Sequence, residues 1–298
     1  MNPLKALLKR NIKLFFRDKG MFFTALITPM ILLVLYATFL ANLYRDSFSL
    51  FVPEGMTIAD SLLDGAVGGQ LLSSLLSVCC VTVAFCSNFL SVQDKVTGVR
   101  NDLMMAPVRS SVMALGYYLA SAAATLLICY AATAVGLIYL GCIGWYLSLH
   151  DVLLILADVF ILSMFGTVLS SVINHFLHTQ GQISAVGSIV SSAYGFICGA
   201  YMPISQFGTV LQKIVSFLPG TYGTALLRTH SMQGVFAEMI AQGIPSEAVE
   251  AMRASVDSKV VLFDTQVSEP MMYAFVIGTV AVLVAVFVLL TKFTRTRT

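Results

Sequence analysis

Six long apolar stretches constrain the fold of this 298-residue chain more than any other feature of its sequence. A helix of about 20 apolar residues crosses the hydrocarbon core of a bilayer, which is about 30 Å thick. Hydrophobic residues make up 58% of the chain and charged residues only 11%, whereas a soluble domain carries about 25% charge. We therefore predict an all-α membrane protein with a single transmembrane domain over residues 1–298. The six predicted spans are 21–43, 67–90, 112–140, 152–172, 183–201 and 271–291.

The segment before the first span, residues 1–20, alternates apolar and basic residues at helical spacing, with Leu7 and Phe15 on one face and Lys9 and Lys13 between them. An amphipathic helix with a basic face is suited to an anionic membrane surface. We predict such an interfacial helix here; the alternative is the charged front end of the first span. That span is too long for a leader peptide and lacks a small-residue cleavage site, so we expect it to be retained. A proline within it, Pro29, predicts a kink.

Lysine and arginine gather in alternate connections between the spans. The N-terminal segment, the connection after the second span and the C-terminal tail hold most of the 17 Lys and Arg residues. Most acidic residues lie in the other connections. Because cytoplasmic loops are enriched in Lys and Arg, we predict that both termini are cytoplasmic, in agreement with an even number of spans.

The longest connection, 202–270, lies on the outer side in this topology and has two parts. The first part is apolar but broken by proline and glycine, and its pieces 210–217 and 221–229 are too short to span the bilayer. We predict short re-entrant helices there, covered by protein. The second part, 237–267, is amphipathic and more polar, and it predicts a small external cap with a helix near 245–256.

Motifs for catalysis are missing from the sequence. It contains no GxxxxGK[ST] phosphate-binding loop, no GxSxG and no HExxH. The cysteines form no CxxC pair, and most lie inside apolar stretches, where they are expected to act as small packing residues. We therefore expect no catalytic residue, no metal site and no nucleic-acid partner.

Three polar side chains leave alternatives open. Asp158 is the one acidic residue inside a predicted span, and it either makes a structural hydrogen bond or contacts a substrate or proton. His175 and His178 are spaced to share a helix face, which fits a plain interfacial role or, with further ligands, metal or proton sensing.

The charged connection after the second span, residues 93–109, stands out in such an apolar chain. Gly98 and Pro107 bracket a predicted short helix at 99–106, because the residue before a proline disfavours helical geometry. Met104 and Met105 would be exposed on this helix, with charges around them. A short helix of this kind is typical of a ligand that docks in a groove of a partner protein.

The order of these features resembles the permease subunit of type-2 ATP-binding-cassette exporters. Such subunits have a basic interfacial helix and six spans. The charged loop after their second span begins with an acidic residue, a basic residue, any two residues and a glycine. A short helix follows, and then a small residue and a proline. Here that pattern is Asp94-Lys95-Val96-Thr97-Gly98, the helix, and Ala106-Pro107. The family's second pattern, after the fifth span, is matched by Gly199, Tyr201, Pro203 and Leu218-Pro219. The outer segment 237–267 is longer and more charged than this family requires.

The resemblance implies roles for individual residues. Residues implied to contact an ATPase subunit through a coupling helix are Asp94, Lys95, Gly98, Val99, Arg100, Asp102, Leu103, Met104, Met105 and Pro107. Residues implied to form an outer gate are Gly199, Tyr201, Pro203, Phe217, Leu218, Pro219 and Tyr222. Candidate residues for the substrate path are Asn88, Asp158 and Ser191. ATP and magnesium would be bound by the partner ATPase, and this chain would bind no cofactor itself.

The function implied by the resemblance is export, driven by a separate cytoplasmic ATPase, through a pair of permease subunits in a bacterial plasma membrane. The apolar interior favours a hydrophobic or amphipathic substrate such as a drug, lipid, peptide or toxin. Whether the two permeases are identical is open. The main alternative is an ion-coupled secondary transporter that uses Asp158; an intramembrane enzyme and a membrane scaffold are further alternatives.

Overall fold

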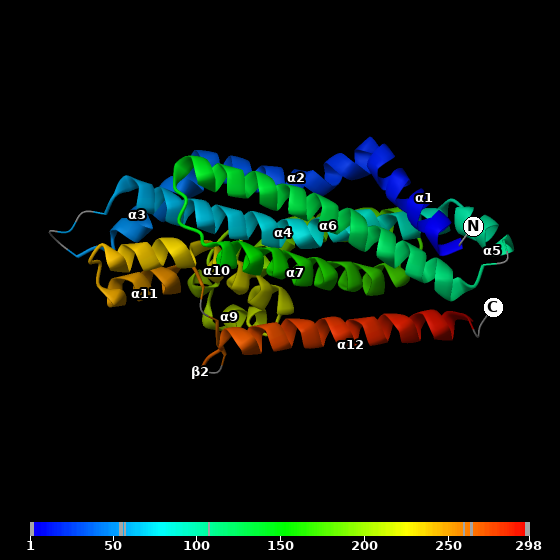
Figure 1. The fold of residues 1–298 in the computed structure, drawn as a ribbon. Coiled ribbons are helices and arrows are strands. Elements are labelled where there is room, and N and C mark those ends of the chain that lie inside the picture. Colours follow the sequence, from blue (N-terminus) through cyan, green and yellow to red (C-terminus); the bar gives the residue numbers. More distant parts are fainter. Residues whose placement is uncertain are drawn as a thin grey trace.

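The computed structural model describes residues 3–53, 56, 58–106, 108–258, 260–262 and 265–295. It is an elongated bundle of helices built around α4, Asp60–Val96, which is buried along most of its 37 residues (Figure 1). The helices α2, α6, α7, α8 and α10 all pack against α4. Backbone groups in a membrane must be satisfied within their own segment, so a buried helix is the natural centre of such a bundle.

Three other long helices agree with predicted spans. These are α6, Ser110–Ile143, α7, Leu149–His175, and α12, Glu269–Arg295. A capping box between Ser148 and Asp151 starts α7, because each side chain accepts a hydrogen bond from the backbone of the other. Each helix extends a few residues beyond its predicted span, since caps and polar first turns continue the helix outside the apolar stretch.

The first predicted span is a helix in three parts. It begins with α2, Lys19–Leu35, capped by the Asp18 side chain, and continues through a π-helical segment η1, Tyr36–Leu40, into α3, Ala41–Ser49. Pro29 lies inside α2. The departure from α-helical geometry therefore falls at η1, two turns after the proline. The N-terminal helix α1, Pro3–Arg17, lies against α6, with Leu7, Asn11 and Phe15 buried.

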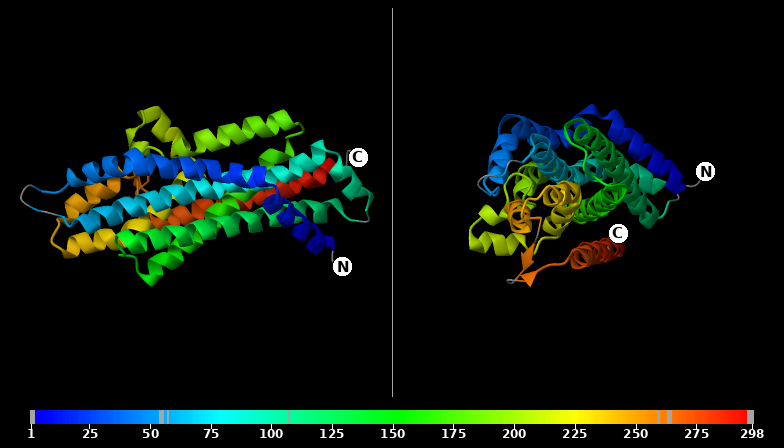
Figure 2. Two further views of the ribbon diagram at one scale, coloured as in Figure 1. Left: turned by 90° about the horizontal axis from the view of Figure 1, so that it is seen from above. Right: turned by 60° about the vertical axis from the view of Figure 1, so that its left-hand side comes forward.

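Five helices among the described residues are long and apolar enough to cross a membrane, and the predicted fifth span is not one of them. That stretch forms α8, Gln180–Ile197, a helix of 18 residues at one edge of the bundle (Figure 2, left). Two glutamines in its first turn and several serines further along lower its hydropathy. The six-span prediction is thus confirmed for five helices.

The connection from 202 to 270 is more helical than predicted. It contains η2, Ile204–Gln206, then α9, Thr209–Val215, α10, Pro219–Ala241, α11, Ser246–Ser255, and the paired two-residue strands β1, Val261–Leu262, and β2, Thr265–Gln266. The piece predicted at 221–229 is part of the 23-residue helix α10. Pro219 starts this helix at a position where its missing N–H removes no bond, and Gly223 lies against Leu162 of α7.

The two ends of the bundle differ. The N-terminus, the short helix α5, Val99–Met105, and the C-terminus lie at one end, and α3, α11 and β2 lie at the other (Figure 1). This arrangement has both termini and the charged connection on one side, as the distribution of basic residues predicts. We call these the terminal end and the distal end.

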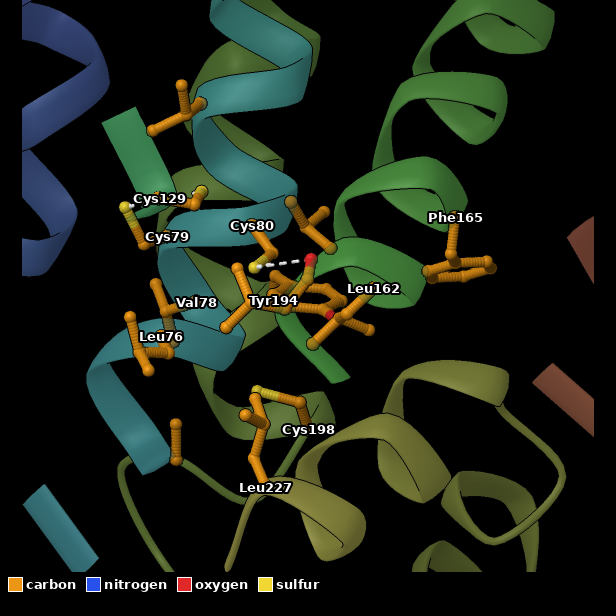
Figure 3. Close-up of a cluster of buried hydrophobic side chains, with 14 of the residues drawn as sticks. Leu76, Val78, Cys79, Cys80, Cys129, Leu162, Phe165, Tyr194, Cys198 and Leu227 are labelled. Carbon is orange, nitrogen blue, oxygen red and sulfur yellow. Dashed lines mark hydrogen bonds between the residues drawn. The ribbon is translucent and has the colours of Figure 1, made fainter. Parts of the chain in front are cut away.

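The middle of the core contains sulfur and aromatic side chains from four helices (Figure 3). Cys80 and Cys198 are buried there, and Cys79 and Cys129 lie with their sulfur atoms 4.0 Å apart. All six cysteines are free thiols, and only Cys142 is exposed. The buried thiols fill space as small apolar groups.

Close contact between α4 and α7 depends on Gly166. A Cβ atom at this position would lie 2.7 Å from the carbonyl oxygen of Cys80 and 3.0 Å from the Cα of Val81. Small residues allow membrane helices to approach this closely. A Cβ atom added at Gly278 on α12 would have no other atom within 4 Å.

We therefore predict that Gly166→Val lowers the free energy of unfolding by about 2 kcal/mol, because it overpacks two backbones. Gly278→Val is the matched control and should change it far less. Unfolding of the purified chain in detergent, followed by circular dichroism, measures both. Equal effects would show that the cost lies in the loss of glycine and not in helix packing.

Candidate functional site

The terminal end is held together by a partly buried ion pair between α1 and α4. The guanidinium of Arg10 donates two hydrogen bonds to the carboxylate of Asp94, at 2.8 and 3.2 Å. Tyr117 of α6 donates a third, at 2.5 Å. Asp94 is 5% exposed, and its hydrogen bonds and charge raise the pKa of Arg10 above its ordinary value. A bidentate pair of this kind fixes geometry as well as charge.

Lys95, the next residue, ties α4 to the end of α7. Its ammonium donates to the carbonyl oxygens of Asn174 and His175, each at 3.2 Å. These are among the last carbonyls of α7, which have no partner within the helix. Asp94 and Lys95 therefore both anchor α4 to its neighbours, on different sides of the helix.

The short helix α5 follows at once and projects from the terminal end. Gly98 precedes it with a φ of 83°, a left-handed conformation that glycine adopts without strain. Met105 is 80% exposed and Met104 48% exposed, while Leu103 is half-buried. Two large apolar side chains at the tip of a short helix that follows the anchored end of α4 form a surface suited to a partner protein.

The other residues assigned to this surface surround the two methionines. Val99 and Arg100 are half-buried at the start of α5, and Asp102 is exposed in its first turn. Pro107 lies outside the described residues. We call Met104, Met105 and Asp102 the α5 tip.

A groove runs between α2 and α8. Two cavities of about 730 and 570 Å³ follow each other along it and share Ile27, Ser188 and Ser191 as lining residues. The larger one lies nearer the distal end and the smaller one nearer the terminal end, where Asp18 and Gln180 line it. Ser191, a candidate for the substrate path from the sequence, lines both cavities, and Ser184 and Ser192 of α8 line the groove too.

The π-helical segment η1 shapes the distal half of this groove. Leu35, Phe39 and Leu40 line the larger cavity beside Tyr44 of α3. The ring of Tyr44 stacks on that of Tyr36, with the centroids 5.8 Å apart. π-Helical turns occur often at functional sites, where they redirect side chains. Here η1 places Tyr36 in the core and leaves Phe39 59% exposed on the groove side.

The groove closes at the distal end with residues from the predicted gate. Tyr201 and Pro203 line the larger cavity. The ring of Tyr201 packs edge-on against Phe196, at 5.1 Å between centroids, and covers Gly195. The predicted gate residues Gly199, Tyr201 and Pro203 thus lie together at the groove mouth.

A buried arginine holds the segment that contains these predicted gate residues in place. Arg228 of α10, 1% exposed, donates to the carbonyl of Gly199, whose φ is 71°. Its guanidinium also lies 4.0 Å from the carboxylate of Asp257, which accepts hydrogen bonds from the backbone N–H groups of Ile204 and Ser205. The chain between α8 and η2 is therefore fixed to the distal end.

The remaining predicted gate residues form a second group. Phe217 is 52% exposed, and Leu218 and Pro219 form the start of α10. Tyr222 is buried, with its ring 4.7 Å from Phe275 of α12. None of these four lines the two cavities between α2 and α8.

The other two candidates for the substrate path lie away from the groove. Asn88 donates hydrogen bonds to Ser170 and Ser171 of α7, at 3.0 and 2.7 Å. Asp158 is 3% exposed; its carboxylate lies 2.6 Å from Nδ1 of His230 and accepts from Tyr273 at 2.5 Å. Both side chains therefore have polar partners on neighbouring helices.

Sequence reasoning missed His230, Tyr273 and Arg228. All three lie far along the chain from their partners, and Arg228 counts by position as a basic residue of an outer loop. One sequence signal could have indicated that Arg228 is buried: polar residues recur on one face of the apolar helix α10, at Thr224, Arg228 and Ser231.

No group of three or more His, Cys, Asp or Glu residues in the described ranges is arranged to hold a metal ion. His175 and His178 lie at and beyond the end of α7.

The Arg10 contact predicts a local effect on α1. In Arg10→Met, the Asp94 carboxylate stays buried and keeps only its bond from Tyr117, so docking of α1 should weaken by about 2 kcal/mol. Hydrogen exchange of α1 amides measures this, because local opening exposes them. Lys13→Met, at an exposed position of the same helix, is the control and should exchange like the wild type. Unchanged exchange in Arg10→Met would show that the ion pair with Asp94 does not hold α1 in place.

Comparison with known proteins gives one family. The chain matches the ABC-2 type transporter family over residues 2–230, which include α1 to α9 and the first half of α10. No curated protein matches it. Because the match covers most of the sequence, and five helices are suited to crossing a bilayer, this chain is a multi-pass membrane protein that belongs to the ABC-2 type transporter family.

Proposed function

We propose that this chain is the permease subunit of an exporter powered by a separate cytoplasmic ATPase, and that it moves hydrophobic or amphipathic molecules. The observation that carries the proposal is the α5 tip: two exposed methionines on a short helix that follows the end of α4, which Asp94 and Lys95 anchor to α1, α6 and α7. Such a surface can transmit force, because its base cannot move without moving the bundle. ATP and magnesium would bind to the partner.

We further propose that α8 crosses the membrane as a sixth span. Its 18 residues extend about 27 Å, close to the thickness of the hydrocarbon core. The serines that lower its hydropathy line the groove, while Ile189 on another face is 63% exposed. The polar face of α8 would then contact protein or substrate, and its apolar face would contact lipid. In this orientation the serine hydroxyls are not exposed to the hydrocarbon of the bilayer, which avoids the free-energy cost of placing them there.

The groove between α2 and α8 is the proposed substrate path. It is lined mainly by apolar side chains with interspersed serine hydroxyls, which suits an amphipathic molecule better than a long glycan. A second permease subunit would cover it, since α2 exposes a row of large apolar residues on this side, among them Ile27 and Ile31. The gate at Tyr201 and Pro203 would then separate the path from the outside.

We expect Met105→Glu to weaken binding of the ATPase encoded beside this chain by at least about tenfold, because a charge would enter an apolar contact. Co-purification and a binding titration in detergent measure the effect. Ser111→Glu adds the same charge at an exposed site on the same end and should bind normally. Normal binding by Met105→Glu would overturn the role of α5.

We expect Ser191→Trp to block the path without affecting ATPase binding, because an indole would fill part of the groove. The measurement is stimulation of ATP hydrolysis by amphipathic compounds in the reconstituted complex, which should be lost while basal hydrolysis persists. Val282→Trp is the control, at a position on α12 that is 63% exposed. Stimulation that survives in Ser191→Trp would place the path elsewhere. Transport that needs no ATP but fails in Asp158→Asn would instead support ion coupling.

A further inference from the structure

A small polar cavity lies at the terminal end between α4, α6, α7 and α12, on a different side from the groove. Its volume is about 60 Å³, enough for a group of a few heavy atoms and too small for a nucleotide. Lys95, Arg100 and His175 line it from one side, and Tyr118 and Phe287 from the other. Transport as proposed above makes no use of this cavity.

The charged side chains that line this cavity are basic. No aspartate or glutamate is among the described residues that line it. The nearest carboxylate in the sequence, Asp94, is already bound by Arg10 and Tyr117. Arg100 lies close enough to Lys95 for their two positive charges to interact. Arg100 makes no hydrogen bond or ion pair with other described residues, and Lys95 uses two of its three N–H donors on carbonyls.

A buried amide in the cavity is also without a partner. Asn174 is 1% exposed, and neither its side-chain nitrogen nor its oxygen has a hydrogen-bond partner among the described residues. Leaving such a group unpaired costs about 1–3 kcal/mol. An amide N–H beside two cations is a donor set suited to an oxyanion.

We propose that this cavity binds the phosphate group of an anionic phospholipid. Its position at the end of the membrane helices is where headgroups lie, and basic pockets between such helices on the cytoplasmic side bind anionic headgroups. Apolar side chains continue from it along the helices: Leu115 of α6 is 44% exposed, and Val284 and Val288 of α12 are 37% and 43% exposed. These would contact the acyl chains.

The site would connect lipid binding to α5. Arg100 belongs to α5, whereas Asn174 and His175 belong to α7. A phosphate held by both would join the two helices across the cavity. This site is independent of the export proposal, because its test measures lipid binding and not transport.

The experiment is native mass spectrometry of the full chain after incubation with equal amounts of phosphatidylglycerol and phosphatidylcholine. We expect wild type to retain phosphatidylglycerol about tenfold better, and Arg100→Gln to lose most of that preference. Arg109→Gln removes an equal charge from an exposed position outside the cavity, and this variant should keep the preference for phosphatidylglycerol. Asn174→Asp, which places a carboxylate in the cavity, should also abolish it.

Thermal unfolding checks that each variant is folded. Of the two cavity variants, Arg100→Gln should disturb folding less than Asn174→Asp, because Arg100 is half-buried and Asn174 is fully buried. A large excess of inorganic phosphate distinguishes the source of the anion. If phosphate displaces the lipid from wild type, the site takes soluble phosphate groups as well; if it does not, the lipid is the ligand. No preference in wild type, or equal losses in Arg100→Gln and Arg109→Gln, would overturn the proposal.

Discussion

Close packing of backbones around α4 is the constraint on which the rest of the structure depends. In a bilayer there is no hydrophobic driving force between helices, so association depends on close approach and on polar contacts. A Cβ atom added at Gly69 of α4 would lie 2.7 Å from the carbonyl oxygen of Ser231 in α10, and one added at Gly166 of α7 would lie equally close to α4. These contacts make α4, α7 and α10 one rigid unit. Polar networks then fix how the helices are rotated: Asp158 joins α7 to α10 and α12, and Asn88 joins α4 to α7.

The elements outside this unit are the ones that form the proposed path. The helix α8 packs mainly on α4, and only about a third of the most apolar stretch of the α2–α3 helix is buried. The groove between α2 and α8 is therefore bounded by two helices that lie outside the unit of α4, α7 and α10. At the distal end, the Arg228 contact to Gly199 holds the chain after α8, and at the other end α1 leads into α2 through the capping residue Asp18. A path whose walls can move while its ends stay attached is suited to alternating between open and closed forms.

The sequence pattern predicted the main helices because each is a local, apolar feature of sufficient length. It also predicted α5, since Gly98 and the following charges are local signals. It failed where the outcome depended on distant residues. Proline and glycine near 219–223 indicated a break, and one lies between Val215 and Pro219, but the predicted piece 221–229 is part of a helix that continues to Ala241. Gly223 lies within this helix, where it allows contact with Leu162. The position of Asp158 was visible in the sequence, but its partners His230 and Tyr273, 72 and 115 residues away, were not. The ATPase, the second permease and the substrate leave no local pattern that specifies them.

The terminal end and the groove are linked through a short series of contacts. The α5 helix follows directly from the end of α4, where Asp94 binds Arg10 of α1. One residue after α1, Asp18 caps α2, whose side chains line the groove. Under the proposed function, a displacement of α5 by an ATPase would act on the end of α4 and, through the bidentate ion pair of Asp94, on α1. Helix α1 would transmit it to α2 across a single capping residue. Among the described residues, the opposite wall, α8, makes no hydrogen bond or ion pair with α1. Motion from the ATPase would thus shift one wall of the groove relative to the other, and this difference between the walls is what would open a path.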